Sequence, residues 1–233
     1  MKVKVGFTPG EELTAPVGVV IDVLRATSVI TQAFAAGYKS VTCTGEIEDA
    51  RELAADEWGV KLAGERHNVK IEGFDFGNSP REFVSRASDA ISLVTTTTNG
   101  TRLMLAAARR CETVFVASLL NLHAVCAAIR STEADEVAIM CAGVEGVFAI
   151  DDAYVAGRIA ERLEGENDDA ALAAIRLAQS FPTALDGIGA GLSAQNIRDN
   201  DLGPDIEFAA AESVVHVVPR IVERSDRWVR LEV

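Results

Sequence analysis

The sequence predicts an α/β fold with three layers, α/β/α, in which helices cover both faces of a mostly parallel or mixed sheet. Two observations carry this prediction. Short β-branched runs alternate along the chain with segments of helical spacing, and 48% of the 233 residues are apolar, which is enough for a large core. No Pro/Gly/Ser-rich linker, repeat or low-complexity tract divides the chain. We therefore expect a single domain over residues 1–233.

Strands are predicted where β-branched residues form short apolar runs, which is the pattern of strands buried on both faces. Helices are predicted between them, with Gly37 and Gly165 as C-terminal stops. The predicted strands cover residues 1–8, 17–21, 40–42, 60–63, 91–94, 113–116 and 137–140. The predicted helices cover residues 28–36, 47–58, 102–110, 119–130 and 152–163. Two further strands, predicted as antiparallel additions at an edge of the sheet, cover residues 214–218 and 228–233.

The charge and the cysteines exclude several classes of protein. The formal net charge is −13, so the basic surface of a nucleic-acid-binding protein is not expected. The N-terminal segment lacks the apolar stretch of a signal peptide, and no apolar run is long enough to cross a bilayer. The four cysteines form no C-x-x-C pair, as is typical of reduced thiols. We expect a cytoplasmic protein without nucleic-acid or membrane partners.

Polar residues follow several of the predicted strands. In an open α/β sheet, ligands bind outside the carboxyl ends of the strands, so residues at these positions are expected to converge on one pocket. Asp22 follows the strand at 17–21, and Glu65 and Arg66 follow the strand at 60–63. A threonine-rich turn follows the strand at 91–94. The sequence therefore predicts a ligand site at this edge.

The turn Thr95-Thr-Thr-Thr-Asn99-Gly100-Thr101 lies between a predicted strand and a predicted helix. The free N–H groups that open a helix, together with its dipole, favour an anion, and threonine hydroxyls add uncharged donors. The alternative is that Thr98 or Thr101 caps the helix and that Asn99-Gly100 is an ordinary turn. The candidate phosphate-binding residues of this turn are Thr97, Thr98, Asn99, Gly100 and Thr101.

Asp22, Arg25 and Thr27 lie where an apolar strand passes into a helix. Asp22 is a candidate magnesium ligand, because a hard cation prefers oxygen donors on a fixed backbone. Arg25 can hold a phosphate or carboxylate with two parallel N–H groups, and Thr27 is a further candidate for substrate binding. The alternative is that Asp22 caps the helix or pairs with Arg25.

Two adjacent carboxylates, Asp151 and Asp152, begin a predicted helix. They complement the helix dipole, but they also repel each other, and a divalent cation would relieve that repulsion. We predict that they bind Mg²⁺ together with Asp22. Glu65 is a candidate metal ligand or base, and Arg66 is a candidate second anion clamp. The alternative is a surface ion pair between them, which would contribute almost nothing to stability.

The segment 73–82 ends in a helix start, with Ser79 as the N-cap and Glu82 as its capping-box partner. Two glycines around Phe-Asp-Phe indicate a close approach to a ligand or to a neighbouring loop. Asp75 and Asn78 are therefore candidate site residues. His67 is expected to be a bystander.

Taken together, these segments resemble the magnesium-dependent 2-phosphosulfolactate phosphatases. The resemblance is carried, in order, by residues 22–27 (DVLRAT), 64–66 (GER), 73–80 (GFDFGNSP), 96–101 (TTTNGT) and 141–143 (CAG). The family tends to carry Glu-Asp at 151–152 and His-Gly after Ser193, where this chain has Asp-Asp and Ala-Gln. The resemblance implies an α/β fold, a bound Mg²⁺ and hydrolysis of the phosphate ester of a 2-hydroxy acid. In methanogens the product, sulfolactate, feeds coenzyme M synthesis.

The expected mechanism is phosphoryl transfer by positioning and charge neutralisation. Whether an aspartate or a water molecule attacks phosphorus is left open. The candidate catalytic residues are Asp22, Arg25, Glu65, Arg66 and Asp75. The candidate substrate-binding residues are Thr27, Asn78, Thr97, Thr98, Asn99, Gly100 and Thr101. The candidate metal ligands are Asp22, Asp151 and Asp152.

Two other functions are considered as alternatives, and a homodimer is considered as the oligomeric state. A phosphometabolite-binding or regulatory protein would keep the phosphate loop without turnover. A dinucleotide enzyme is disfavoured, because residues 22–28 occupy the place of a Gly-x-Gly-x-x-Gly turn. The expected partner is a small anionic phosphorylated substrate, and a homodimer is an open possibility.

Overall fold

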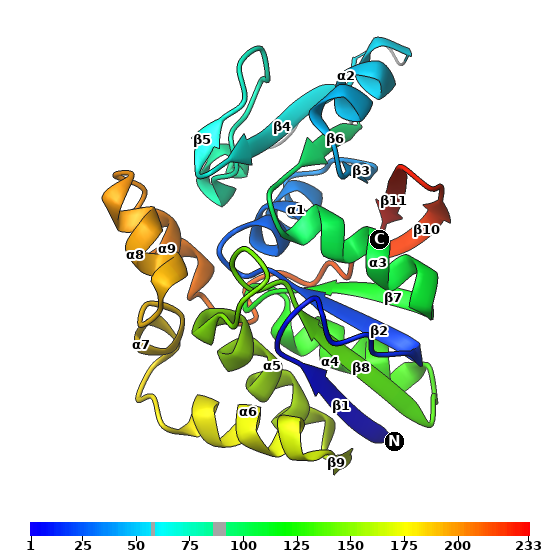
Figure 1. Ribbon diagram of the computed structural model, residues 1–233, viewed down its shortest axis with the longest axis vertical. Coiled ribbons are helices and arrows are strands. Elements are labelled where there is room, and N and C mark those ends of the chain that lie inside the picture. Colours follow the sequence, from blue (N-terminus) through cyan, green and yellow to red (C-terminus); the bar gives the residue numbers. More distant parts are fainter. Residues whose placement is uncertain (57–58, 86–91) are drawn as a thin grey trace.

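A computed structural model describes residues 1–56, 59–85 and 92–233. Within these residues one sheet of eleven strands runs through the molecule, in the order β5-β4-β6-β3-β11-β10-β7-β2-β8-β1-β9 (Figure 1). The strands are β1 (Lys2–Gly6), β2 (Ala15–Ile21), β3 (Val41–Thr44), β4 (Lys61–Arg66), β5 (Val69–Lys70), β6 (Leu93–Thr96), β7 (Cys111–Ala117), β8 (Glu136–Cys141), β9 (Glu166–Asn167), β10 (Arg220–Arg224) and β11 (Trp228–Glu232).

Helices connect most of these strands. None of the helices within the described ranges is both long and apolar enough to cross a membrane. The helices are α1 (Ala26–Ala35), α2 (Ile47–Asp56), the 3₁₀ helix η1 (Pro80–Phe83), α3 (Gly100–Arg110), α4 (Leu122–Ser131), α5 (Ile150–Leu163), α6 (Asp169–Gln179), α7 (Ala184–Ile188), α8 (Leu192–Asp199) and α9 (Pro204–Ala209).

Strand β2 shows how the sheet is buried on both faces. It pairs in parallel with β7 and with β8. Val17, Val19 and Ile21 pack in one apolar cluster with residues of α4 and α5, whereas Val20 packs in a second cluster with residues of α1 and α3. Successive side chains of a strand point to opposite faces, so helices cover both faces of β2. The predicted α/β class with a mixed, mostly parallel sheet is confirmed.

The position of the C-terminal strands differs from the prediction. Residues 214–218 form no strand, and β10 begins at Arg220 instead. The hairpin of β10 and β11 is antiparallel, as expected, but it does not lie at an edge. Strand β11 pairs with β3 and β10 pairs with β7, so the hairpin joins the two halves of the sheet (Figure 1). The prediction of an edge position was wrong.

Several boundaries also differ from the predicted ones. Strand β6 includes Thr95 and Thr96, and β4 continues through Arg66, so these residues belong to strands rather than to turns. Gly37 follows α1 with φ +104° and ends it, as predicted. Helix α5 ends at Leu163, and the residue that takes the left-handed conformation at its end is Glu164 rather than Gly165. The predicted residues 57, 58 and 91 lie outside the described ranges.

Candidate active site

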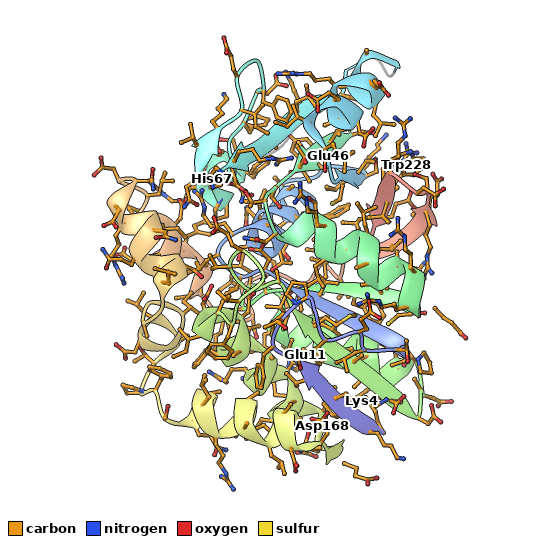
Figure 2. All side chains as sticks on the ribbon, viewed as in Figure 1. Lys4, Glu11, Glu46, His67, Asp168 and Trp228 are labelled. Carbon is orange, nitrogen blue, oxygen red and sulfur yellow. The ribbon has the colours of Figure 1, made fainter. Side chains whose placement is uncertain are left out.

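A pocket of about 380 Å³ opens at the carboxyl ends of the parallel strands. Its walls come from the loop after β2, the end of β4 with the turn that follows, the turn between β6 and α3, the turn after β8, and helix α8. Figure 2 shows His67 in the turn after β4, on the side that faces α8. Asp22 and Asn99, which are far apart in the sequence, line this same pocket. The distant strand ends therefore converge at one place.

Asp22 lies directly after β2, where the chain leaves the sheet for α1. Its Oδ1 accepts the N–H of Ala26 at 3.2 Å. The start of α3 packs so closely against it that a Cβ on Gly100 would lie 2.6 Å from Asp22 Oδ2, so only glycine permits this approach. Burial, and then the negative charges of Glu65 and Asp151, raises the pKa of Asp22 from 3.8 to about 7.

The two aspartates that begin α5 have different surroundings. Asp152 accepts the N–H groups of Val23 at 2.9 Å and Gly143 at 3.0 Å, so it connects the loops after β2 and β8. Asp151 Oδ1 accepts the hydroxyl of Ser193 at 2.8 Å, and Ser193 lines the pocket. Burial raises the pKa of Asp151 to about 6, and burial followed by repulsion from neighbouring carboxylates raises that of Asp152 well above 3.8. Asp151 thus stands directly behind the pocket wall.

Of the three predicted metal ligands, only Asp22 lines the pocket. In the part of the chain that the structure describes, no group of three or more His, Cys, Asp or Glu side chains is arranged to hold a metal ion. Mg²⁺ in enzymes commonly takes one or two carboxylates and completes its shell with water and substrate phosphate. Asp22 and Asp151 are neighbouring buried carboxylates, and they would supply one or two of the ligands of such a site.

Glu65 joins the end of β4 to the threonine turn. It is buried, and it accepts the N–H of Thr98 at 2.9 Å and the Thr98 hydroxyl at 3.1 Å. It also accepts the N–H of Asn68 at 2.8 Å. In the predicted phosphate cradle, a carboxylate of the chain itself therefore already binds the Thr98 donors.

The hydroxyls of the other threonines mostly form hydrogen bonds with backbone groups. Thr97 and Thr101 exchange hydrogen bonds, with the N–H of each donating to the hydroxyl of the other at 3.1 and 3.3 Å. The Thr27 hydroxyl donates to the Asp22 carbonyl at 2.9 Å. These three side chains do not line the pocket, whereas Thr98 and Asn99 do. Thr97 and Thr101 therefore tie the turn to the first residues of α3, whereas the N-cap is Asn99 and neither Thr98 nor Thr101 caps the helix with its side chain.

Arg25 lines the pocket as a buried cation. Its Nη1 donates to Asp205 Oδ2 at 2.7 Å, and its Nη2 donates to Asn68 Oδ1 at 3.3 Å. Asn78 lines the same pocket, and its buried Oδ1 has no hydrogen-bond partner among the described residues. Arg25 and Asn78 are therefore available to a ligand at the base of the pocket.

Two predicted site residues, Arg66 and Asp75, do not line the pocket. Glu65 and Arg66 are consecutive in β4, so their side chains point to opposite faces and only Glu65 reaches the pocket. Asp75 lies at the surface, where it pairs with Lys61 Nζ at 2.8 Å and accepts the N–H of Leu62 at 2.9 Å. The structure does not bring Arg66 and Asp75 to the pocket, and their roles in the site stay predictions.

Arg66 instead binds the backbone around β4 and β6, and this suggests a test. Its guanidinium donates to the carbonyls of Glu65 at 2.9 Å and Gly45 at 3.1 Å, and to Thr96 Oγ1 at 3.0 Å. We expect Arg66→Met to lower the free energy of unfolding by roughly 1–3 kcal/mol, because these acceptors lose a charged donor. The KM for substrate should stay within about twofold of wild type. Thermal unfolding and steady-state kinetics check this, and a large rise in KM would return Arg66 to the site.

Several residues that line the pocket, or that hold a lining residue as Asp205 holds Arg25, had no sequence signal that identified them. Asp205 follows Gly203-Pro204, so it looks like an acidic residue that complements a helix dipole, yet it is fully buried against Arg25. The wall from α8 and the turns after β4 and β8 supply mainly amide and acidic side chains. These further lining residues are Asn68, Glu145, Ser193, Asn196, Asp199 and Asn200.

A polar pocket with buried carboxylates, at the carboxyl ends of a mostly parallel sheet, defines an α/β enzyme that acts on a small polar ligand. The sequence comparisons give the particular family. The profile of the 2-phosphosulfolactate phosphatase family matches residues 5–224. The chain belongs to this family, and it is accordingly a phosphoric monoester hydrolase.

Relatives match over nearly the whole chain. A protein of Thermus thermophilus is 38% identical over 224 residues, which cover 94% of each chain. A protein of Caldanaerobacter subterraneus subsp. tengcongensis is 40% identical over 210 residues, which cover 87% of this chain and 86% of the relative. A Thermotoga maritima protein is 37% identical over 223 residues, which cover 94% and 95%. All three are named probable 2-phosphosulfolactate phosphatase.

Proposed function

We propose that this chain is a Mg²⁺-dependent phosphatase that hydrolyses the phosphate ester of a 2-hydroxy acid, with 2-phosphosulfolactate as the leading substrate. Water cleaves the ester to give sulfolactate and inorganic phosphate. The proposal places the reaction in the cytoplasm and, in organisms that make coenzyme M, on the route to that coenzyme. The homodimer considered above stays a prediction.

The observation that carries the proposal is the charge of the pocket. Its cationic side chains are Arg25 and, when protonated, His67, against the carboxylates of Asp22, Glu65, Glu145 and Asp199. A substrate with phosphate, carboxylate and sulfonate groups is a polyanion, and this lining would repel it. A divalent cation on Asp22 and Asp151 would compensate both the buried carboxylates and the substrate. The acidic lining thus favours a metal-dependent reaction.

The residues of the chain would then bind and orient the substrate. A bound Mg²⁺ supplies charge neutralisation for the phosphoryl oxygens. Asn99 and the start of α3 present amide groups and the positive end of the helix dipole to the same region. Glu65 holds Thr98 in place through two hydrogen bonds. Arg25 neutralises a further oxyanion group of the substrate.

The test is a screen of phosphorylated 2-hydroxy acids, including 2-phosphosulfolactate and 2-phospholactate, for release of inorganic phosphate. We expect release with Mg²⁺, loss of release with EDTA, and recovery when Mg²⁺ is restored in excess. Calorimetry with the same compounds is run in parallel. Tight binding without phosphate release would contradict the proposal and would favour the phosphometabolite-binding alternative.

A further inference from the structure

The guanidinium of Arg25 is buried, and only one of its nitrogens contacts a carboxylate. In its ion pair with Asp205, the side chains are 2% and 0% exposed. The Nη2 donates only to Asn68 Oδ1, at a long 3.3 Å, and Nε has no hydrogen-bond partner among the described residues. A buried N–H without an acceptor costs about 1–3 kcal/mol, so the unpaired Nε indicates a group that accepts from it.

The unpaired nitrogen belongs to a particular edge of the guanidinium. The N–H of Nε and the adjacent N–H of Nη2 point the same way and form a fork of two parallel donors, which matches carboxylate, phosphate or sulfonate oxygens. Asp205 binds Nη1, on the other side of the group. The Nε/Nη2 edge of Arg25 is therefore the one left for a ligand in the pocket that Arg25 lines.

Asp205 is itself held in one orientation. Its Oδ2 accepts from Arg25, and its Oδ1 accepts the Ser79 hydroxyl at 2.6 Å. Arg81 lies 4.0 Å from the same Oδ1. Since each carboxylate oxygen has its own partner, Asp205 contacts Arg25 through one nitrogen only. The contact joins the start of α9 to η1 and to the loop before α1.

We propose that Asp205 is a positioning residue that fixes Arg25 so that its Nε/Nη2 edge receives an oxyanion group of the substrate. This inference rests on the proposed function and deepens it. Without Asp205, the guanidinium is attracted to the carboxylates of the same pocket, Asp22 and Glu65. The anion would then lose its forked partner, although the chain would still carry the charge of Arg25.

The test compares Asp205→Asn with wild type in three measurements. The KM for the phosphorylated substrate is expected to rise about tenfold, which equals the loss of one hydrogen bond to a charged group, while kcat changes less than about threefold. Binding of inorganic phosphate and of lactate is measured by calorimetry. Weaker phosphate binding places the phosphoryl group on Arg25, and weaker lactate binding places the carboxylate there. Weaker binding of neither, with a raised KM, places the sulfonate there, whereas an unchanged KM with unchanged binding of both overturns the proposal.

A double-mutant comparison separates positioning from general destabilisation. Arg25→Lys keeps the charge but not the fork, so it should show a similar loss. When Arg25→Lys is combined with Asp205→Asn, the KM should rise little beyond that of either single variant. If the two increases in KM multiply, as they do for independent sites, the proposal is overturned. Glu212→Gln is the matched control, because it breaks the Arg158–Glu212 ion pair outside the pocket lining and should leave KM unchanged.

A second pair of variants covers the case in which Asp205→Asn does not fold. Ser79→Ala removes a hydrogen bond to Asp205 and also disturbs the capping box, whereas Glu82→Gln disturbs the capping box and the contact of Glu82 with the Gly77 N–H but leaves the Ser79–Asp205 hydrogen bond in place. A rise in KM for Ser79→Ala but not for Glu82→Gln supports the proposal, and equal effects oppose it. If wild type releases no phosphate, the calorimetric arms still decide whether Asp205 positions Arg25. That outcome would refute the proposed function alone.

Discussion

Replacement of Asp22 by alanine is expected to abolish Mg²⁺-dependent phosphate release, with a loss of roughly a thousandfold or more in kcat. Asp22 is the one predicted metal ligand that lines the pocket, and the start of α3 packs against it. Steady-state kinetics with the best substrate of the screen measures the loss. Circular dichroism and thermal unfolding establish that the variant is folded. Retained turnover would remove Asp22 from the metal and catalytic roles.

Asp75→Asn is the matched control for this experiment. It also exchanges an aspartate that the sequence placed in the site, but the structure places Asp75 at the surface beside Lys61. Its kcat and KM should stay within about twofold of wild type. An equal loss in both variants would mean that the pocket described here is not the site of the reaction.

The second large effect concerns stability. Asp22→Asn is expected to raise the melting temperature of the metal-free protein at pH 8 by roughly 5–10 °C. Burial and neighbouring carboxylates raise the pKa of Asp22 from 3.8 to about 7, so above pH 7 the folded protein holds a charge that it disfavours. A shift of that size corresponds to about 2–4 kcal/mol. The amide keeps an acceptor for the N–H of Ala26 without carrying the charge.

The sign of this effect fixes its dependence on pH. A raised carboxyl pKa contributes stability that is present below the unfolded value of 3.8 and is lost as the pH rises through about 7. The gain from Asp22→Asn should therefore vanish near pH 4 and grow up to about pH 8. Asp75 should show the opposite change in stability, because its pKa is lowered rather than raised. Despite burial, the Leu62 N–H and Lys61 lower its pKa, so Asp75→Asn should lose stability at pH 8. A gain for Asp22→Asn that is independent of pH would contradict the account.

The strand and helix order could be predicted from the sequence because local patterns dictate it. The apolar runs that became β2, β7 and β8 have strands on both sides and helices on both faces, so their composition reflects their burial. The place of the C-terminal hairpin could not be predicted. Strand pairing between β11 and β3 depends on partners more than 180 positions apart, as in Trp228 with Thr44, and no local pattern encodes that choice.

A pocket residue could be predicted where its own position at the end of a strand brings it to the pocket. It could not be predicted where contact with a residue far away in the sequence brings it there. Asp22 follows a strand end, and that position alone brings it to the pocket. Arg66 was expected beside Glu65, but β4 continues three residues beyond the predicted end at Ala63, so the alternation of the strand turns Arg66 away from the pocket that Glu65 lines. Asp205 was missed because its partner Arg25 lies 180 positions away. Such long-range ion pairs leave no trace in local spacing.

The hairpin that joins the two halves of the sheet has a consequence for biosynthesis. Strand β3 ends at Thr44 and β7 ends at Ala117, but β10 begins only at Arg220. While the ribosome makes the intervening residues, the flanks of β3 and β7 expose unsatisfied amides and carbonyls. Open flanks of this kind recruit other chains, so the nascent polypeptide is most prone to aggregation in that interval. Chaperone binding during translation would protect it until the last two strands arrive.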